Sequence, residues 1–159
     1  MNIQIVELKE IEIVEVEGEF EQRFINAKKY PAFLTNASIK RGYDSGLLES
    51  SLFEDLLKLK GLETFVNAAN EDEETALEIM SAFDEQKLIS LIYLGVIGAN
   101  RKLDMSLDDF IEMYHLSFTD TIQLYANLIM GFVGGSNDFA KGLNASSKGK
   151  KKHQHKAQN

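Results

Sequence analysis

The sequence predicts an α+β fold that is mainly α. It has a small N-terminal antiparallel β-sheet, a compact bundle of about five or six helices and a disordered basic C-terminal tail. The first 25 residues alternate Ile, Val and Phe with Glu, which is typical of strands. From residue 31 onward, apolar residues recur at helical spacing. The last sixteen residues contain five lysines and no aromatic, branched aliphatic or acidic side chain, so burial cannot offset the entropy of ordering them.

The N-terminal sheet is expected to contain two or three short strands. Turns are predicted near Lys9–Glu10 and Glu17–Gly18, where polar residues and glycine interrupt the alternation. The alternation changes phase at Ile13–Val14, which predicts a β-bulge there. These strands would form a β meander over residues 1–26.

The first helices are predicted from their start and stop signals. Pro31 suits the first turn of a helix, which Gly42 or Gly46 would end. Ser51 and Glu54 have the spacing of a capping box, in which each side chain accepts a hydrogen bond from a free backbone N–H. A second helix is therefore expected to begin at Ser51.

The middle of the chain predicts a buried central helix. An acidic run at 71–74 comes before a helical stretch, and carboxylates stabilise a helix N-terminus. The segment from Glu85 to Asn100 is apolar almost all round, as expected for a helix surrounded by others. Its apolar-rich run of 12 residues, 88–99, is shorter than the roughly 20 that a membrane-spanning helix needs.

Two further helices are expected near the end of the domain. Ser106 and Asp109 predict the start of a short helix, and Ser117 or Thr119 the start of a longer one. Gly134–Gly135 would end the longer helix.

The expected organisation is one globular domain and a tail. The domain covers residues 1–140, with its helical part at 31–134, and the flexible basic tail covers 141–159. The first ten residues have no signal-peptide pattern.

The two parts carry opposite charge. All 25 acidic residues lie at or before Asp138, whereas six of the 17 basic residues follow it. The body therefore has 11 basic against 25 acidic residues, a net charge of −14, and the tail carries +6. Such a body repels phosphate backbones, so nucleic acid is not expected as a partner of the folded part, although the lysine tail could contact RNA, DNA or an acidic partner. No membrane is expected as a partner, because the longest apolar run is too short to span one.

The residues that catalysis or metal binding would need are scarce. Without cysteine, the chain forms no disulfide and has no thiol nucleophile or cysteine-ligated zinc site. The body has one histidine, His115, and no G-x-S-x-G motif accompanies it. The acidic pairs at Asp108–Asp109 and in 71–74 lack calcium-loop spacing and fit helix starts better. We expect no enzyme activity, and no catalytic, cofactor-binding or metal-binding residues.

Three stretches, taken in order, resemble the tail assembly chaperones of siphophages that infect Gram-positive bacteria. They are FLTNASIKRGYDSGLLESSLFEDLLKLKGLETF, IYLGVIGANRKLDMSLDDFIEMYHLSFTDTIQLYANLI and NDFAKGLNASSKGKKK. The resemblance covers roughly residues 31–152. It implies a largely helical protein of the host cell cytoplasm, without a cofactor, that binds the long tape measure protein and keeps it soluble. Tail tube subunits then polymerise around the tape measure, and the chaperone is absent from the mature virion.

The resemblance also offers a role for the tail. In this family some ribosomes change frame near the end of the gene, which yields a long form with an additional C-terminal domain. Lys150, Lys151 and Lys152, with Lys148 before them, are the kind of run that an A-rich slippery sequence encodes. The tail is then a candidate frameshift junction, and the long form would contact the tail tube protein.

Candidate partner-binding residues lie near the end of the domain. Phe132, Phe139 and Leu143 are the candidates for client contact, with a core or linker role as the alternative. Self-association also remains open.

Two other functions stay open at this point. An acidic regulatory or DNA-mimicking adaptor would bind a nucleic-acid-binding protein, and that contact would weaken steeply with salt. A small hydrolase would need two converging carboxylates in a cleft.

Overall fold

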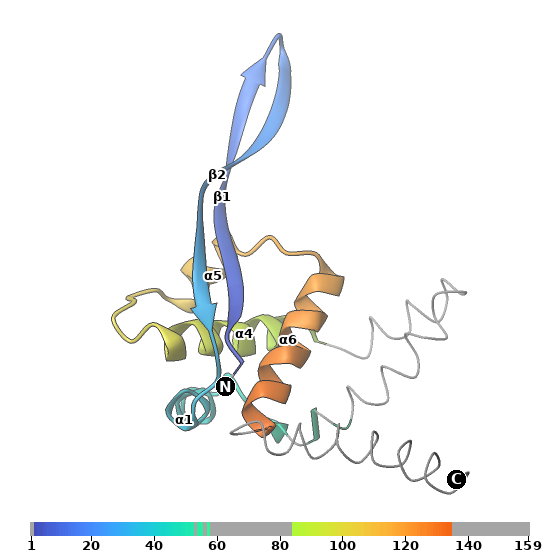
Figure 1. Cartoon of the computed structure of the whole chain (residues 1–159). Coiled ribbons are helices and arrows are strands. Elements are labelled where there is room, and N and C mark those ends of the chain that lie inside the picture. Colours follow the sequence, from blue (N-terminus) through green and yellow to red (C-terminus); the bar gives the residue numbers. More distant parts are fainter. Residues whose placement is uncertain (1, 53, 56, 58–83, 135–159) are drawn as a thin grey trace, which may run out of the picture.

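The structure is a computed structural model that describes residues 2–52, 54, 55, 57 and 84–134 (Figure 1). Two antiparallel strands form a hairpin, β1 (Gln4–Val16) and β2 (Glu19–Ala32). Four helices accompany it among the described residues: α1 (Asn36–Asp44), α4 (Glu85–Ala99), α5 (Leu107–Met113) and α6 (Phe118–Val133). The predicted bundle of five or six helices is therefore wrong. One side of the central helix packs against the base of a long hairpin instead of further helices.

The hairpin replaces the predicted meander of short strands. Its strands have 13 and 14 residues and are joined at Glu17–Gly18, where both residues have positive φ (54° and 82°). Positive φ at both central residues matches the twist of a tight hairpin turn, so the predicted turn at this position is confirmed. The turn predicted at Lys9–Glu10 is wrong because β1 continues through it. Pro31 lies in β2 opposite Ile5, where a strand with a free outer edge tolerates the missing N–H.

The β-bulge lies nearer the N-terminus than predicted. The register shifts between Leu8 and Glu10, where Asn26 and Ala27 of β2 lie opposite Lys9. Asn26 has φ 54°, and its side-chain amide donates a hydrogen bond to the Glu10 carboxylate at 3.0 Å. The strand pairing is regular through Ile13–Val14, so the bulge predicted there is absent. Two adjacent apolar residues in a regular strand simply project from opposite faces.

The core lies between α4, the base of the hairpin and the other helices. Val6 and Leu8 of β1 and Ala32 of β2 are buried there, and α4 contacts α1, α5, α6 and β2. Eight residues of α4 are buried, which confirms its predicted central place. Among the described residues no helix is long and apolar enough to span a membrane.

Helix α1 begins later than predicted because a capping box lies at Thr35. The Ser38 N–H donates to Thr35 Oγ1 at 3.0 Å, and the Thr35 N–H donates to Ser38 Oγ at 2.9 Å. The helix continues through Gly42 and ends before Gly46. Gly42 lies against α4, and a Cβ there would be 2.6 Å from Leu94 Cδ1.

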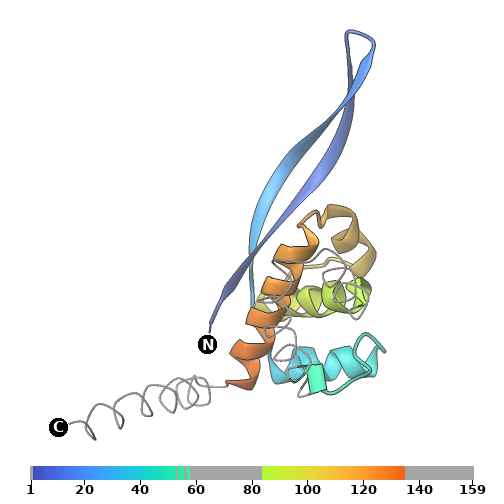
Figure 2. The same cartoon turned by 90° about the vertical axis from the view of Figure 1, so that its right-hand side faces the viewer.

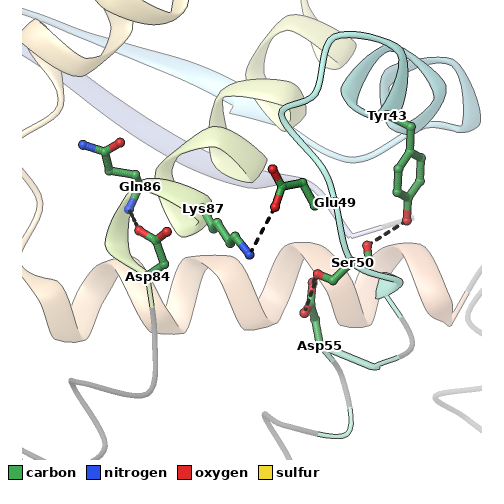
Figure 3. Close-up of polar contacts among 7 residues, drawn as sticks. All are labelled: Tyr43, Glu49, Ser50, Asp55, Asp84, Gln86 and Lys87. Carbon is green, nitrogen blue, oxygen red and sulfur yellow. Dashed lines mark hydrogen bonds and ion pairs between the residues drawn. The ribbon is translucent and has the colours of Figure 1, made fainter.

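Polar contacts join the segment after α1 to the rest of the helical layer (Figure 3). The Tyr43 hydroxyl donates to the Ser50 carbonyl oxygen at 3.0 Å, and the Ser50 hydroxyl donates to Asp55 at 3.1 Å. Lys87 Nζ at the start of α4 lies 3.8 Å from Glu49 Oε2. The two hydrogen bonds order the segment after α1, and the exposed Glu49–Lys87 pair places that segment beside the first turn of α4.

The starts of α5 and α6 confirm the sequence prediction. Ser106 caps α5 by accepting from the Asp109 N–H, and Ser117 caps α6 by accepting from the Asp120 N–H, both at 3.1 Å. Gly134 is the C-cap of α6, as expected.

Several predicted segments lie wholly or partly outside the described residues. After Ser51, Leu52, Glu54, Asp55 and Leu57 are helical, and the Ser51 carbonyl oxygen accepts from the Asp55 N–H at 3.1 Å. The remainder of that predicted helix, the acidic run at 71–74 and the tail at 141–159 are outside.

Candidate functional site

The most distinctive described feature is the part of the hairpin beyond the bulge, residues 10–25, which we call the arm. It extends away from the helices, with its turn at the far end (Figures 1 and 2). Its inner end lies near α5 and the segment after it, through Glu10, Ile11 and Phe24. A two-stranded ribbon in water is marginally stable alone, so an arm with two free edges favours a role in contacting another molecule.

One face of the arm is apolar. Ile11 pairs with Phe24, Ile13 with Gln22, and Glu15 with Phe20, and paired residues project from the same face of a sheet. Ile11, Ile13, Phe20 and Phe24 therefore share a face, which we call the apolar arm face. Their exposed fractions are 43%, 61%, 77% and 50% respectively. Four large, exposed apolar side chains on one narrow ribbon are typical of a binding surface.

The opposite face of the arm carries more of the charge. Alternation and pairing place four glutamates on it, interspersed with three apolar residues and one arginine: Glu10, Glu12, Glu19, Glu21, Val14, Val16, Ile25 and Arg23. The whole arm contains six glutamates against one basic residue, Arg23, a net charge of −5. Two arms laid together would repel each other, so the charge favours a partner that is not a second arm.

The inner end of the apolar arm face is fixed to the body. Lys9 Nζ lies 4.1 Å from the centroid of the Phe24 ring, a cation–π contact. The His115 ring lies 5.6 Å from the same ring, centroid to centroid. His115 Nε2 is buried without a hydrogen-bond partner among the described residues, so this histidine acts here as a packing surface for Phe24.

The turn between α5 and α6 fixes the segment that carries His115. The Thr121 hydroxyl donates to the Ser117 carbonyl oxygen at 2.8 Å, and the Tyr114 and Thr121 hydroxyls are 2.8 Å apart and buried. Burial raises the pKa of Tyr114 from 10.0 to about 12, so its hydroxyl stays protonated up to a higher pH than that of an exposed tyrosine. Burial and the nearby Asp55 carboxylate likewise raise the pKa of Tyr125.

An acidic cleft lies where the arm meets α5. Its volume is about 550 Å³, and it is lined by carboxylates together with apolar side chains: Glu10, Asp104, Asp109, Glu112, Ile11, Met105 and Met113. In the described part of the chain, no cluster of three or more His, Asp or Glu side chains is arranged to hold a metal ion. Asp108 and Asp109 lie in the first turn of α5, as the sequence indicated for this pair.

The predicted partner-binding residues do not coincide with the arm. Phe132 is half-buried on α6 and packs against the core, which agrees with the alternative role considered for it. Phe139, Leu143 and the lysines at 148, 150, 151 and 152 lie outside the described residues.

The apolar arm face was missed at the sequence level, although a signal for it exists. Ile and Phe alternate with Glu from Ile11 to Phe24, and this alternation was interpreted only as part of a small antiparallel sheet within the globular domain. The core receives only the base of the hairpin. The excess of glutamate in both strands is the feature that could have indicated a ribbon exposed to solvent.

Comparison with protein-family models, with curated proteins and with solved structures found no match.

Proposed function

We propose that this chain is a binding protein without catalytic activity that covers apolar segments of a client protein, and that it serves as a tail assembly chaperone of a siphophage. The client is the tape measure protein. The protein acts in the host cell cytoplasm, the tail tube protein is contacted through the long form, and the finished virion lacks the chaperone.

The observation that carries this proposal is the apolar arm face. Phe20 and Ile13 are the most exposed large apolar side chains of the arm, and burying such side chains supplies binding free energy. The acidic opposite face keeps a complex dispersed in water. The resemblance of residues 31–152 to the chaperone family supports the choice of client, while the arm lies outside that stretch and supplies the contact surface.

The direct experiment is co-expression of the tape measure protein with and without this chain. We expect the soluble fraction of the tape measure protein to rise severalfold when the chain is present. An equally insoluble tape measure protein in both cultures would rule out the chaperone role.

An acidic adaptor is the second candidate function, and the net charge of −5 on the arm favours it. Under that alternative a basic nucleic-acid-binding protein would contact the glutamates of the arm. The affinity of the chain for that protein would fall steeply as salt rises from about 50 to about 500 mM, because salt screens exposed charges. The affinity for an apolar client would change little over the same range.

A further inference from the structure

We infer that the cleft between the base of β2 and the loop after α4 binds a short acidic peptide segment of a partner protein. We call it the basic cleft. Its volume is about 490 Å³, and four cationic side chains line it: Lys28, Lys29, Arg101 and Lys102. This inference does not depend on the proposed function, because it uses neither the arm nor the tape measure protein.

The distribution of ion pairs separates these four cations from the others. The described residues contain nine Lys and Arg against eighteen Asp and Glu. Four of the nine lie within 3.8 Å of a described carboxylate: Lys9, Arg23, Lys40 and Lys87. The basic cleft contains four of the remaining five, none of which has a described carboxylate at that distance, and Arg41 is the fifth. Four cations that share one cleft and have no carboxylate partner among the described residues favour the binding of an anionic ligand there.

The two walls of the basic cleft are held together by a side-chain amide. Asn100 Nδ2 donates to the Pro31 carbonyl oxygen at 2.9 Å and to the Val96 carbonyl oxygen at 2.7 Å. The Leu103 N–H donates to the Asn100 carbonyl oxygen at 2.9 Å, which closes the turn that carries Arg101 and Lys102. The cations therefore project from walls that are already in place, which lowers the ordering cost of binding.

The lining favours a peptide over a nucleic acid. Tyr30, Pro31 and Leu103 add apolar surface beside the cations, and Lys28 Nζ lies 5.2 Å from the centroid of the Tyr30 ring. The outer edge of β2 has no third strand among the described residues, so an extended peptide could pair with it. The excess of carboxylates over cations among the described residues would also repel a long polyanion, whereas a few acidic side chains can contact the cleft alone.

The test is isothermal titration calorimetry of the full chain with an acetylated, amidated hexaglutamate peptide at low salt. The double variant Lys29→Gln/Arg101→Gln removes two cations of the cleft, both exposed. We expect it to weaken binding at least tenfold. The matched control Lys40→Gln/Lys87→Gln removes two cations that already have carboxylate partners, and it should change the affinity less than twofold.

Four results would overturn the inference. One is the absence of peptide binding to the unmodified chain. The second is equal weakening in both double variants, and the third is undiminished binding in the cleft variant, since charge elsewhere, including the C-terminal lysines, would then account for binding. The fourth is tighter binding of a 20-nucleotide oligothymidylate than of the peptide. A second cleft variant, Lys28→Gln/Lys102→Gln, should reproduce the loss, and thermal unfolding monitored by circular dichroism checks that each variant is folded.

Discussion

Phe20→Thr tests the apolar arm face at its most exposed position. Phe20 is 77% exposed, so most of its apolar surface is still available to a client. Burying a phenylalanine fully contributes about 1.5–3 kcal/mol, so the exposed part corresponds to about 1–2 kcal/mol of binding free energy. The substitution should therefore raise the Kd for the client roughly 5- to 30-fold.

The same reasoning applies to Ile13→Thr, which has a matched control on the same strand. Ile13 is 61% exposed on the arm, and Ile5 is 58% exposed near the start of β1, outside the arm. Threonine keeps the branched Cβ that suits a strand, so both substitutions mainly remove apolar surface. We expect Ile13→Thr to weaken client binding about tenfold, while Ile5→Thr leaves it within twofold.

The assay is biolayer interferometry with an immobilised soluble fragment of the tape measure protein. Because Phe20 and Ile13 contribute little to the core, their variants should unfold within about 0.5 kcal/mol of the unmodified chain in urea. Equal affinity of the Phe20→Thr, Ile13→Thr and Ile5→Thr variants for the fragment would refute the reasoning.

Three further predictions concern the body, and chemical denaturation measures each one. Gly42→Ala should destabilise the fold by about 1–3 kcal/mol because the new Cβ would meet Leu94 at 2.6 Å; an unchanged midpoint would show that α1 moves away at no cost. Thr35→Ala should cost about 1 kcal/mol by removing the N-cap of α1, while Thr35→Ser should retain most of the stability, and similar losses in the two variants would contradict the capping role. The pKa of Tyr114 is raised from 10.0 to about 12, so its contribution to stability is complete below pH 10 and is lost as the pH rises toward 12. Tyr114→Phe should make the fall in unfolding free energy over this range shallower, and an identical pH profile in the variant would exclude this residue as a source of the fall.

The elements that the sequence predicted well are those with local chemical signals. Ser106 and Ser117 begin helices because their hydroxyls accept from backbone N–H groups three residues later, and that spacing is visible in the sequence. Glu17–Gly18 joins the strands because glycine adopts positive φ without strain. The apolar composition of α4 likewise predicted its burial.

The features that were mispredicted depend on contacts between distant residues. Pro31 is compatible with a helix start and with an edge strand, and only its pairing with Ile5 decides between them. The bulge at Asn26 is stabilised by a hydrogen bond to Glu10, sixteen residues away, which no local phase change reveals. The alternation of the arm gives the direction of each side chain but not whether other elements cover it, so alternation alone does not distinguish the apolar arm face from a core face. The excess of glutamate is the only sequence feature that points to exposure.

The same limit applies to the basic cleft. Its cations come from two pairs of adjacent residues, at 28–29 and 101–102, which lie far apart in the sequence. The fold brings the pairs together, and the hydrogen bond from Asn100 to Pro31 joins the segments that carry them. In a chain with a net charge of −8, neither pair is conspicuous alone.

Hydrogen–deuterium exchange of the chain with and without the tape measure protein tests the central claim most directly. The arm has free edges and an uncovered apolar face, so its outer amides should exchange quickly in the free protein. Bound client should slow exchange strongly in residues 10–25 and leave the buried α4 unchanged. Unchanged exchange in the arm, with protection confined to the helices, would contradict the account.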